Sequence, residues 1–179
     1  SSTFDNVPVN VHQIGGKPDG PWVATTDAPV MMEFDINSLE TKGRKKVSPK
    51  LTSIGGVELF STAHPCVRNG KSYNYLLEYK PLSGKNQAHI TSIDAQGDRK
   101  IVGTVELEPW EIPYIHMISV TENFAVLCIW PLQISMSKMI NGDGFMPQLE
   151  WTGNRTNTRI HVFHLTPHDE GNKSGAFYI

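Results

Sequence analysis

The chain has 179 residues, a formal net charge of −2 and a hydrophobic content of 39%. This length suits one domain, and the absence of a basic excess argues against nucleic acid as a partner. No apolar run reaches about 18 residues, so the sequence predicts no transmembrane helix.

Short apolar or alternating segments separated by turn residues dominate the chain, which is typical of an all-β protein. Helical periodicity is nearly absent. The predicted strands are Val9–Ile14, Trp22–Thr25, Val30–Phe34, Val57–Ser61, Ser72–Glu78, Ala88–Asp94, Lys100–Glu106, Ile115–Val120, Phe124–Trp130 and Arg159–His164. Turns rich in Asp, Asn and Gly follow several of these strands, because those residues tolerate turn conformations.

A strand followed by a polar turn recurs near residues 32–35, 91–94 and 161–164. This recurrence suits about three four-stranded blades of a β-propeller, and it suits a sandwich or barrel of about ten strands equally well. A propeller typically closes with roughly 4–8 blades. The propeller interpretation therefore expects further blades outside this chain, since an open set would leave strand edges exposed. The missing initial Met also suggests a chain that begins within a longer protein.

Histidines are the main candidates for metal chemistry, because a neutral imidazole is a good ligand for iron. His64 stands before a Pro at the end of an apolar run, and His116 stands at the start of another. A lone histidine in such a place is more often structural than a ligand. His161, His164 and His168 have helical spacing, but a strand would point the first two to opposite faces.

Four groups of segments are spaced along the chain in a recognisable series. They are Trp22-Val-Ala-Thr-Thr-Asp-Ala-Pro with Glu33-Phe-Asp-Ile-Asn-Ser-Leu-Glu-Thr, Ser61-Thr-Ala-His-Pro with Ser72-Tyr-Asn-Tyr, Pro113-Tyr-Ile-His-Met-Ile-Ser-Val-Thr-Glu-Asn-Phe-Ala-Val, and Trp130-Pro-Leu-Gln-Ile. In order and spacing they resemble the carotenoid cleavage oxygenase family over roughly residues 5–165.

The resemblance implies a seven-bladed β-propeller, of which residues 1–179 would form one partial domain with about three blades. Four histidines hold iron on the axis of the family's propeller. Two of them fall on His64 and His116, and the other two lie later in the family's chain, with no match here. A glutamate that orients a ligand imidazole in the family falls near Asp27, which is shorter by one methylene. Its preferred partner is expected to be a ligand outside this chain.

The resemblance further implies an iron(II)-dependent dioxygenase that uses O2 to cleave a conjugated C=C bond of a carotenoid or apocarotenoid. The chain would then be a fragment that is inactive by itself. The alternatives are a non-catalytic carotenoid- or retinoid-binding propeller, a retinoid isomerohydrolase, and an unrelated all-β module. A cytoplasmic protein is expected, free or peripheral to a membrane. Ile134–Met146 is a candidate membrane-facing patch, although core packing or a loop explains it better.

Overall fold

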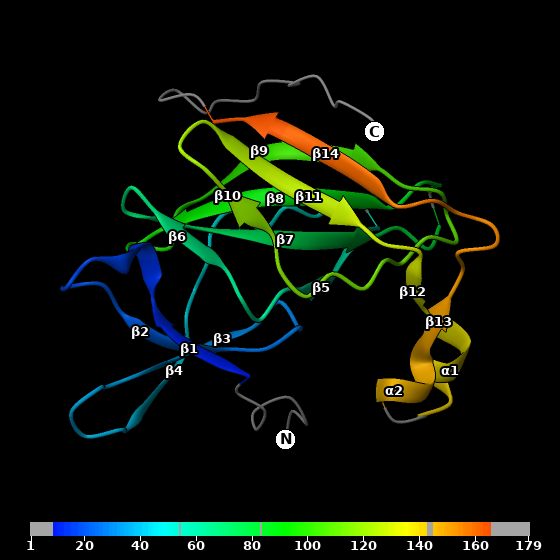
Figure 1. The fold of residues 1–179 in the computed structure, drawn as a ribbon. Coiled ribbons are helices and arrows are strands. Elements are labelled where there is room, and N and C mark those ends of the chain that lie inside the picture. Colours follow the sequence, from blue (N-terminus) through cyan, green and yellow to red (C-terminus); the bar gives the residue numbers. More distant parts are fainter. Residues whose placement is uncertain (1–8, 54, 83, 143–144, 166–179) are drawn as a thin grey trace.

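The computed structural model describes residues 9–53, 55–82, 84–142 and 145–165. These residues form three antiparallel sheets and a small hairpin with two short helices (Figure 1). Each sheet is built mainly from strands that are close in sequence, which is the arrangement that local hairpins produce.

The first sheet contains four strands in sequence order, each antiparallel to the next. They are β1 (Asn10–Gln13), β2 (Trp22–Thr25), β3 (Met31–Phe34) and β4 (Thr41–Arg44). A short 3₁₀ turn, η1 (Ile14–Gly16), follows β1 and contacts the second sheet. Gly15 is required there, because its φ is 73° and an added Cβ would lie 2.6 Å from the carbonyl oxygen of Gly70.

The second sheet provides the centre of the molecule. It contains β5 (Val57–Ser61), β7 (Lys71–Tyr79), β8 (Gln87–Asp94) and β9 (Arg99–Glu106), and β6 (Cys66–Arg68) also pairs with β7. The third sheet contains β10 (Ser119–Val120), β11 (Phe124–Ile129) and β14 (Arg159–His164). The hairpin of β12 (Leu132–Ile134) and β13 (Leu149–Trp151) encloses α1 (Met136–Ile140) and α2 (Phe145–Gln148).

The main hydrophobic core lies between the second and third sheets. It includes Tyr75, Leu77 and Ile90 of the second sheet with Leu127 and Phe163 of the third. A smaller cluster of Ile14, Val23 and Ile93 lies between the first and second sheets. The sheets therefore pack face to face through alternating buried side chains, as consecutive layers of a β protein do.

Most predicted strands are present, and β2, β5 and β14 have the predicted bounds. The predicted strand Ile115–Val120 was too long, because only Ser119–Val120 pairs as a strand and Met117 forms a single bridge to His64. The two short helices were not predicted. Their segment, Ile134–Met146, begins with a buried Ile134 and contains the exposed Ile140.

His161 and His164 lie on opposite faces of β14, as expected for a strand. His161 is buried in β14, whereas His164 is exposed and contacts the ring of Phe124. The two side chains therefore point to opposite faces, and His168 lies outside the described residues.

Candidate metal centre

His64 and His116 come from different parts of the chain and lie side by side. Their ring centroids are 4.6 Å apart and the ring planes are inclined by 64°. His64 lies in the connection between β5 and β6, and it forms a parallel bridge with Met117, the residue after His116. This pairing of two short segments brings two imidazoles that are distant in sequence into one place.

The His64 connection is anchored by buried polar contacts. Thr62 and Ala63 are fully buried, and the carbonyl oxygen of Ala63 accepts hydrogen bonds from Thr25 Oγ1 (2.8 Å) and Asn10 Nδ2 (3.0 Å). The side chain of Asn74 on β7 binds the same connection through Thr62. The backbone beside His64 is therefore held by both the first and the second sheet.

Asp27, in the turn between β2 and β3, connects the two histidine segments. Its Oδ1 accepts a hydrogen bond from the Ala63 N–H at 3.1 Å, and its Oδ2 accepts one from the Tyr114 hydroxyl at 3.2 Å. Asp27 Oδ1 also lies 3.9 Å from His116 Nδ1. Among the described residues this carboxylate therefore faces His116, while the expected partner outside this chain stays a prediction.

Tyr114 fills the space between Asp27 and His116. Its hydroxyl lies 3.0 Å from His116 Nδ1 while it donates to Asp27. Burial, together with the charge and hydrogen bond of Asp27, raises the pKa of Tyr114 to about 12, so the hydroxyl keeps its proton at neutral pH. With that proton directed at Asp27, the hydroxyl oxygen can accept a hydrogen bond from His116 Nδ1.

The donor set fits a ferrous ion chemically. If Nδ1 of His116 donates to Tyr114, Nε2 is the ring nitrogen that remains to bind a metal, which is the usual arrangement of a histidine ligand and its outer partner. Neutral imidazoles suit iron. Within the described part of the chain, however, no group of three or more His, Cys, Asp or Glu side chains is arranged to hold a metal ion. The geometry thus provides two adjacent imidazoles and the residues that support them.

Sequence reasoning missed Tyr114. A signal was available, because Tyr114 and His116 are two residues apart in an extended segment, where alternate side chains share one side. Its contact with Asp27 joins residues 87 positions apart and depends on how the first sheet packs on the rest of the molecule. No local pattern contains that information.

The other described histidines have different surroundings. His89 is buried in β8, with Nδ1 2.9 Å from Thr104 Oγ1 and Nε2 3.4 Å from Glu78 Oε2. Burial lowers the pKa of His89, although Glu78 acts in the opposite direction. These contacts satisfy both ring nitrogens inside the second sheet, which is a structural role.

Comparison with known proteins gives a match over nearly the whole chain. The family described as "Retinal pigment epithelial membrane protein" (RPE65) matches residues 3–178. No curated protein matches the sequence.

Several solved structures are similar to the chain. A variant of the Synechocystis apocarotenoid oxygenase has a TM-score of 0.62 at 15% identity, over 95% of this chain and 34% of that one. A chimera of an apocarotenoid oxygenase and RPE65 has a TM-score of 0.62 at 14% identity, with the same coverage. The Pseudomonas brassicacearum lignostilbene dioxygenase has a TM-score of 0.59 at 19% identity, over 91% of this chain and 32% of that one.

These likenesses establish the fold. The chain spans about a third of the length of the solved structures that it matches. The prediction of an all-β chain that forms part of a propeller is confirmed, and the sandwich or barrel alternative is discarded.

Proposed function

The chain belongs to the RPE65 and carotenoid oxygenase family, and on this premise we propose that it forms part of an iron(II)-dependent dioxygenase that cleaves a conjugated C=C bond of a carotenoid or apocarotenoid. The observation that supports this function best is the adjacency of His64 and His116, whose ring centroids are 4.6 Å apart. We further propose that residues 1–179 belong to a single propeller domain.

In this proposal His64 and His116 are two of the ligands of the iron. The bound Fe(II) supplies the activation of O2, and both oxygen atoms enter the product as the two carbonyl groups that replace the C=C bond. The role of this chain's own residues is to fix two imidazoles side by side. The buried connection around Ala63 holds one imidazole, and Tyr114 orients the other.

Asp27 acts on both ligands through different groups. It holds the His64 segment through the backbone of Ala63, and it holds His116 through the Tyr114 hydroxyl. An aspartate is one methylene shorter than a glutamate, and the Tyr114 hydroxyl bridges Asp27 Oδ2 and His116 Nδ1. We therefore assign Asp27 and Tyr114 as positioning residues.

The printed names of two similar structures support oxygenase chemistry and differ in substrate. One is an apocarotenoid oxygenase and the other a lignostilbene dioxygenase. The family match to RPE65 keeps retinoid isomerisation as the second candidate reaction. Product analysis separates the two, because cleavage yields two carbonyl fragments from one polyene, whereas isomerisation preserves its carbon number.

The same proposal places the protein in the cytoplasm, in peripheral contact with a membrane that holds its polyene substrate. No helix among the described residues could span a membrane. The exposed apolar side chains of Ile140 and Met146, near Lys138, support contact with a bilayer surface. Unchanged sedimentation of an Ile140→Ser variant with lipid vesicles would contradict this contact.

The deciding experiment measures bound iron in the full-length protein. We expect about one iron per protein, and His64→Ala or His116→Ala should lower that stoichiometry by at least about tenfold, since each removes a ligand. His164→Ala is the matched control, because His164 is exposed on β14 and far along the chain from both ligands. Full retention of iron in both ligand variants, with normal folding, would exclude the assignment.

A further inference from the structure

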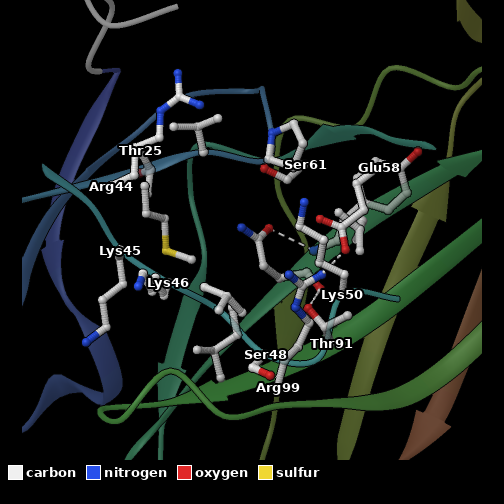
Figure 2. Close-up of a pocket in the computed structure, with 18 residues that line it drawn as sticks. Thr25, Arg44, Lys45, Lys46, Ser48, Lys50, Glu58, Ser61, Thr91 and Arg99 are labelled. Atoms are coloured by element: carbon white, nitrogen blue, oxygen red, sulfur yellow. Dashed lines mark hydrogen bonds and ion pairs between the residues drawn. The ribbon is translucent and has the colours of Figure 1, made fainter. Parts of the chain in front are cut away.

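A cavity of about 460 Å³ lies between the first and second sheets, and Figure 2 shows the side chains around it. The segment that follows β4 forms one wall, and β7, β8 and the start of β9 form the other. The apolar part of the lining includes Pro29, Val30, Met31, Val47, Tyr75, Leu76 and Ile93. None of His64, His116 and Asp27 lines this cavity, although Thr25 and Asn74, which hold the His64 connection, do.

The cavity is strongly basic for its size. Five of its lining residues carry a positive charge, namely Arg44, Lys45, Lys46, Lys50 and Arg99, whereas a single one, Glu58, carries a negative charge. Figure 2 labels all five of these residues. The charge of the lining thus favours an anion.

The pairing of these charges shows which ones are available to a ligand. Lys45 faces Glu33 at 3.7 Å, and Arg99 binds Glu58 at 2.7 Å. Lys46 and Lys50, by contrast, form no ion pair with any described residue, and both side chains belong to exposed residues at the rim. Two ammonium groups can therefore meet an incoming anion without first breaking an existing pair.

Arg99 adds a positive charge to the inner wall of the cavity. Its side chain is only 8% exposed, and its Nε is buried without a hydrogen-bond partner in the described part of the structure. A buried guanidinium N–H without an acceptor is costly. Protein atoms enclose this Nε, so a head group in the cavity would reach Arg99 only through the rest of its guanidinium, which already binds Glu58.

We propose that this cavity binds an amphiphilic anion, a molecule with a short apolar chain and a single carboxylate or phosphate head. The apolar chain would contact the lining formed by Val30, Val47 and Leu76, and the head would be held by Lys46, Lys50 and Arg99. Both a free amphiphile and a membrane lipid offer this chemistry. The small, walled space favours a chain of limited length over an extended surface partner.

Calorimetric titration of the full-length protein with decyl phosphate, below its micelle-forming concentration, tests the proposal. Lys46→Glu and Lys50→Glu should each weaken binding by about tenfold, because each reverses a charge next to the head. Val30→Trp, which fills the apolar part of the cavity, should abolish binding. Lys17→Glu is the control, since it makes the same charge change on an exposed residue outside the cavity, and it should leave the affinity unchanged.

Titrations with decanol and with lipid vesicles separate recognition of the charged head from general hydrophobic attraction. Decanol should bind at least about tenfold more weakly than decyl phosphate, because it lacks the charge that the lysines recognise. Binding of anionic vesicles that is lost in Lys50→Glu and kept in Lys17→Glu would identify a membrane lipid as the source of the head. Equal binding of decanol, equal losses in the pocket and control variants, or no binding of decyl phosphate at all would overturn the proposal.

Discussion

Tyr114 is the residue whose role depends most directly on one atom. Its hydroxyl lies between a carboxylate and an imidazole nitrogen, and nothing else in its side chain distinguishes it from phenylalanine. Because the hydroxyl donates to Asp27, it presents a lone pair to His116 Nδ1. A partner of this kind fixes both the tautomer and the orientation of a metal-binding imidazole.

Tyr114→Phe should weaken iron binding by about 10- to 100-fold, the usual effect of removing an outer partner of a metal ligand. Competition with a chelator of known affinity measures this change without any catalytic assay. Adding Asp27→Glu to Tyr114→Phe should recover part of the affinity, since the longer carboxylate can reach toward Nδ1 directly. Tyr79→Phe, at the end of β7, is the matched control. An unchanged affinity in Tyr114→Phe would remove the positioning role.

The largely buried His12 makes the folding stability of the protein depend on pH. Burial lowers its pKa from 6.5 to about 4, and its Nδ1 is buried without a partner among the described residues. In the unfolded chain the pKa returns to about 6.5, so below that pH the unfolded state binds a proton that the folded state resists. The stability contribution of neutral His12 is therefore complete above pH 6.5 and falls as the pH drops toward 4.

His12→Leu should remove this loss of folding stability at low pH. Its urea midpoint, relative to that of the parent protein, should rise as the pH is lowered from 7 to 4.5. His164→Leu serves as the comparison, because solvent reaches His164 in the folded protein. A difference between His12→Leu and the parent that stays constant across this range would show that His12 is not the responsible group.

At the scale of elements, the contact between β9 and β14 joins the second sheet to the third. Gly103 of β9 lies directly under the ring of Phe163, and a Cβ added to Gly103 would stand 2.0 Å from Phe163 Cδ1. Phe163 is only 2% exposed, so the ring has little space to move away. The absence of a side chain at Gly103 thus allows the two sheets to approach.

Gly103→Ala should destabilise the protein by about 1–3 kcal/mol, as overpacking of a core usually does. Chemical denaturation measures the change. Phe163→Leu should itself be destabilising, yet the double variant Gly103→Ala/Phe163→Leu should be more stable than the sum of the two single changes predicts, since the smaller side chain relieves the clash. Additive effects in this cycle would contradict the proposed contact.

The sequence predicted elements well where apolar residues alternate, and poorly elsewhere. β2 and β14 were predicted within their observed bounds because each presents a buried face. β4 was missed because its residues, Thr41–Arg44, are polar and largely exposed. The extended run before β10 was overestimated, since its apolar residues Ile115 and Ile118 are buried without strand pairing.

For the candidate site, the sequence could predict which residues are present but not how they are arranged. His64, His116 and Asp27 were named from a family resemblance, and their roles as ligands and support remain predictions. The distances between them depend on three segments that meet only after the sheets have packed. Position favoured these two histidines only weakly, as residues at the ends of apolar runs, over His89, whose partners are Glu78 and Thr104 inside one sheet.

At the scale of the whole molecule, the proposed function gives this chain two of the four histidine ligands that the family resemblance implies. We therefore expect the 179-residue chain by itself to bind iron weakly and to release no cleavage product from an apocarotenoid with O2. Chromatographic detection of aldehyde products, with the full-length protein as the positive control, measures this. Turnover by the isolated chain would show that two histidines suffice, and the ligand assignment would need revision.

Asp27 belongs to the first sheet, yet its carboxylate touches the segments of both histidines. The spacing of the two imidazoles therefore depends on the packing of the first sheet as well as on the His64–Met117 bridge, and under the proposed function metal affinity would report on that packing. A substitution far from either ring, for example at the small cluster of Ile14 and Val23 beneath the first sheet, should then loosen the ion before it unfolds the protein. Iron would bind last during folding, and it would dissociate first when the protein is destabilised.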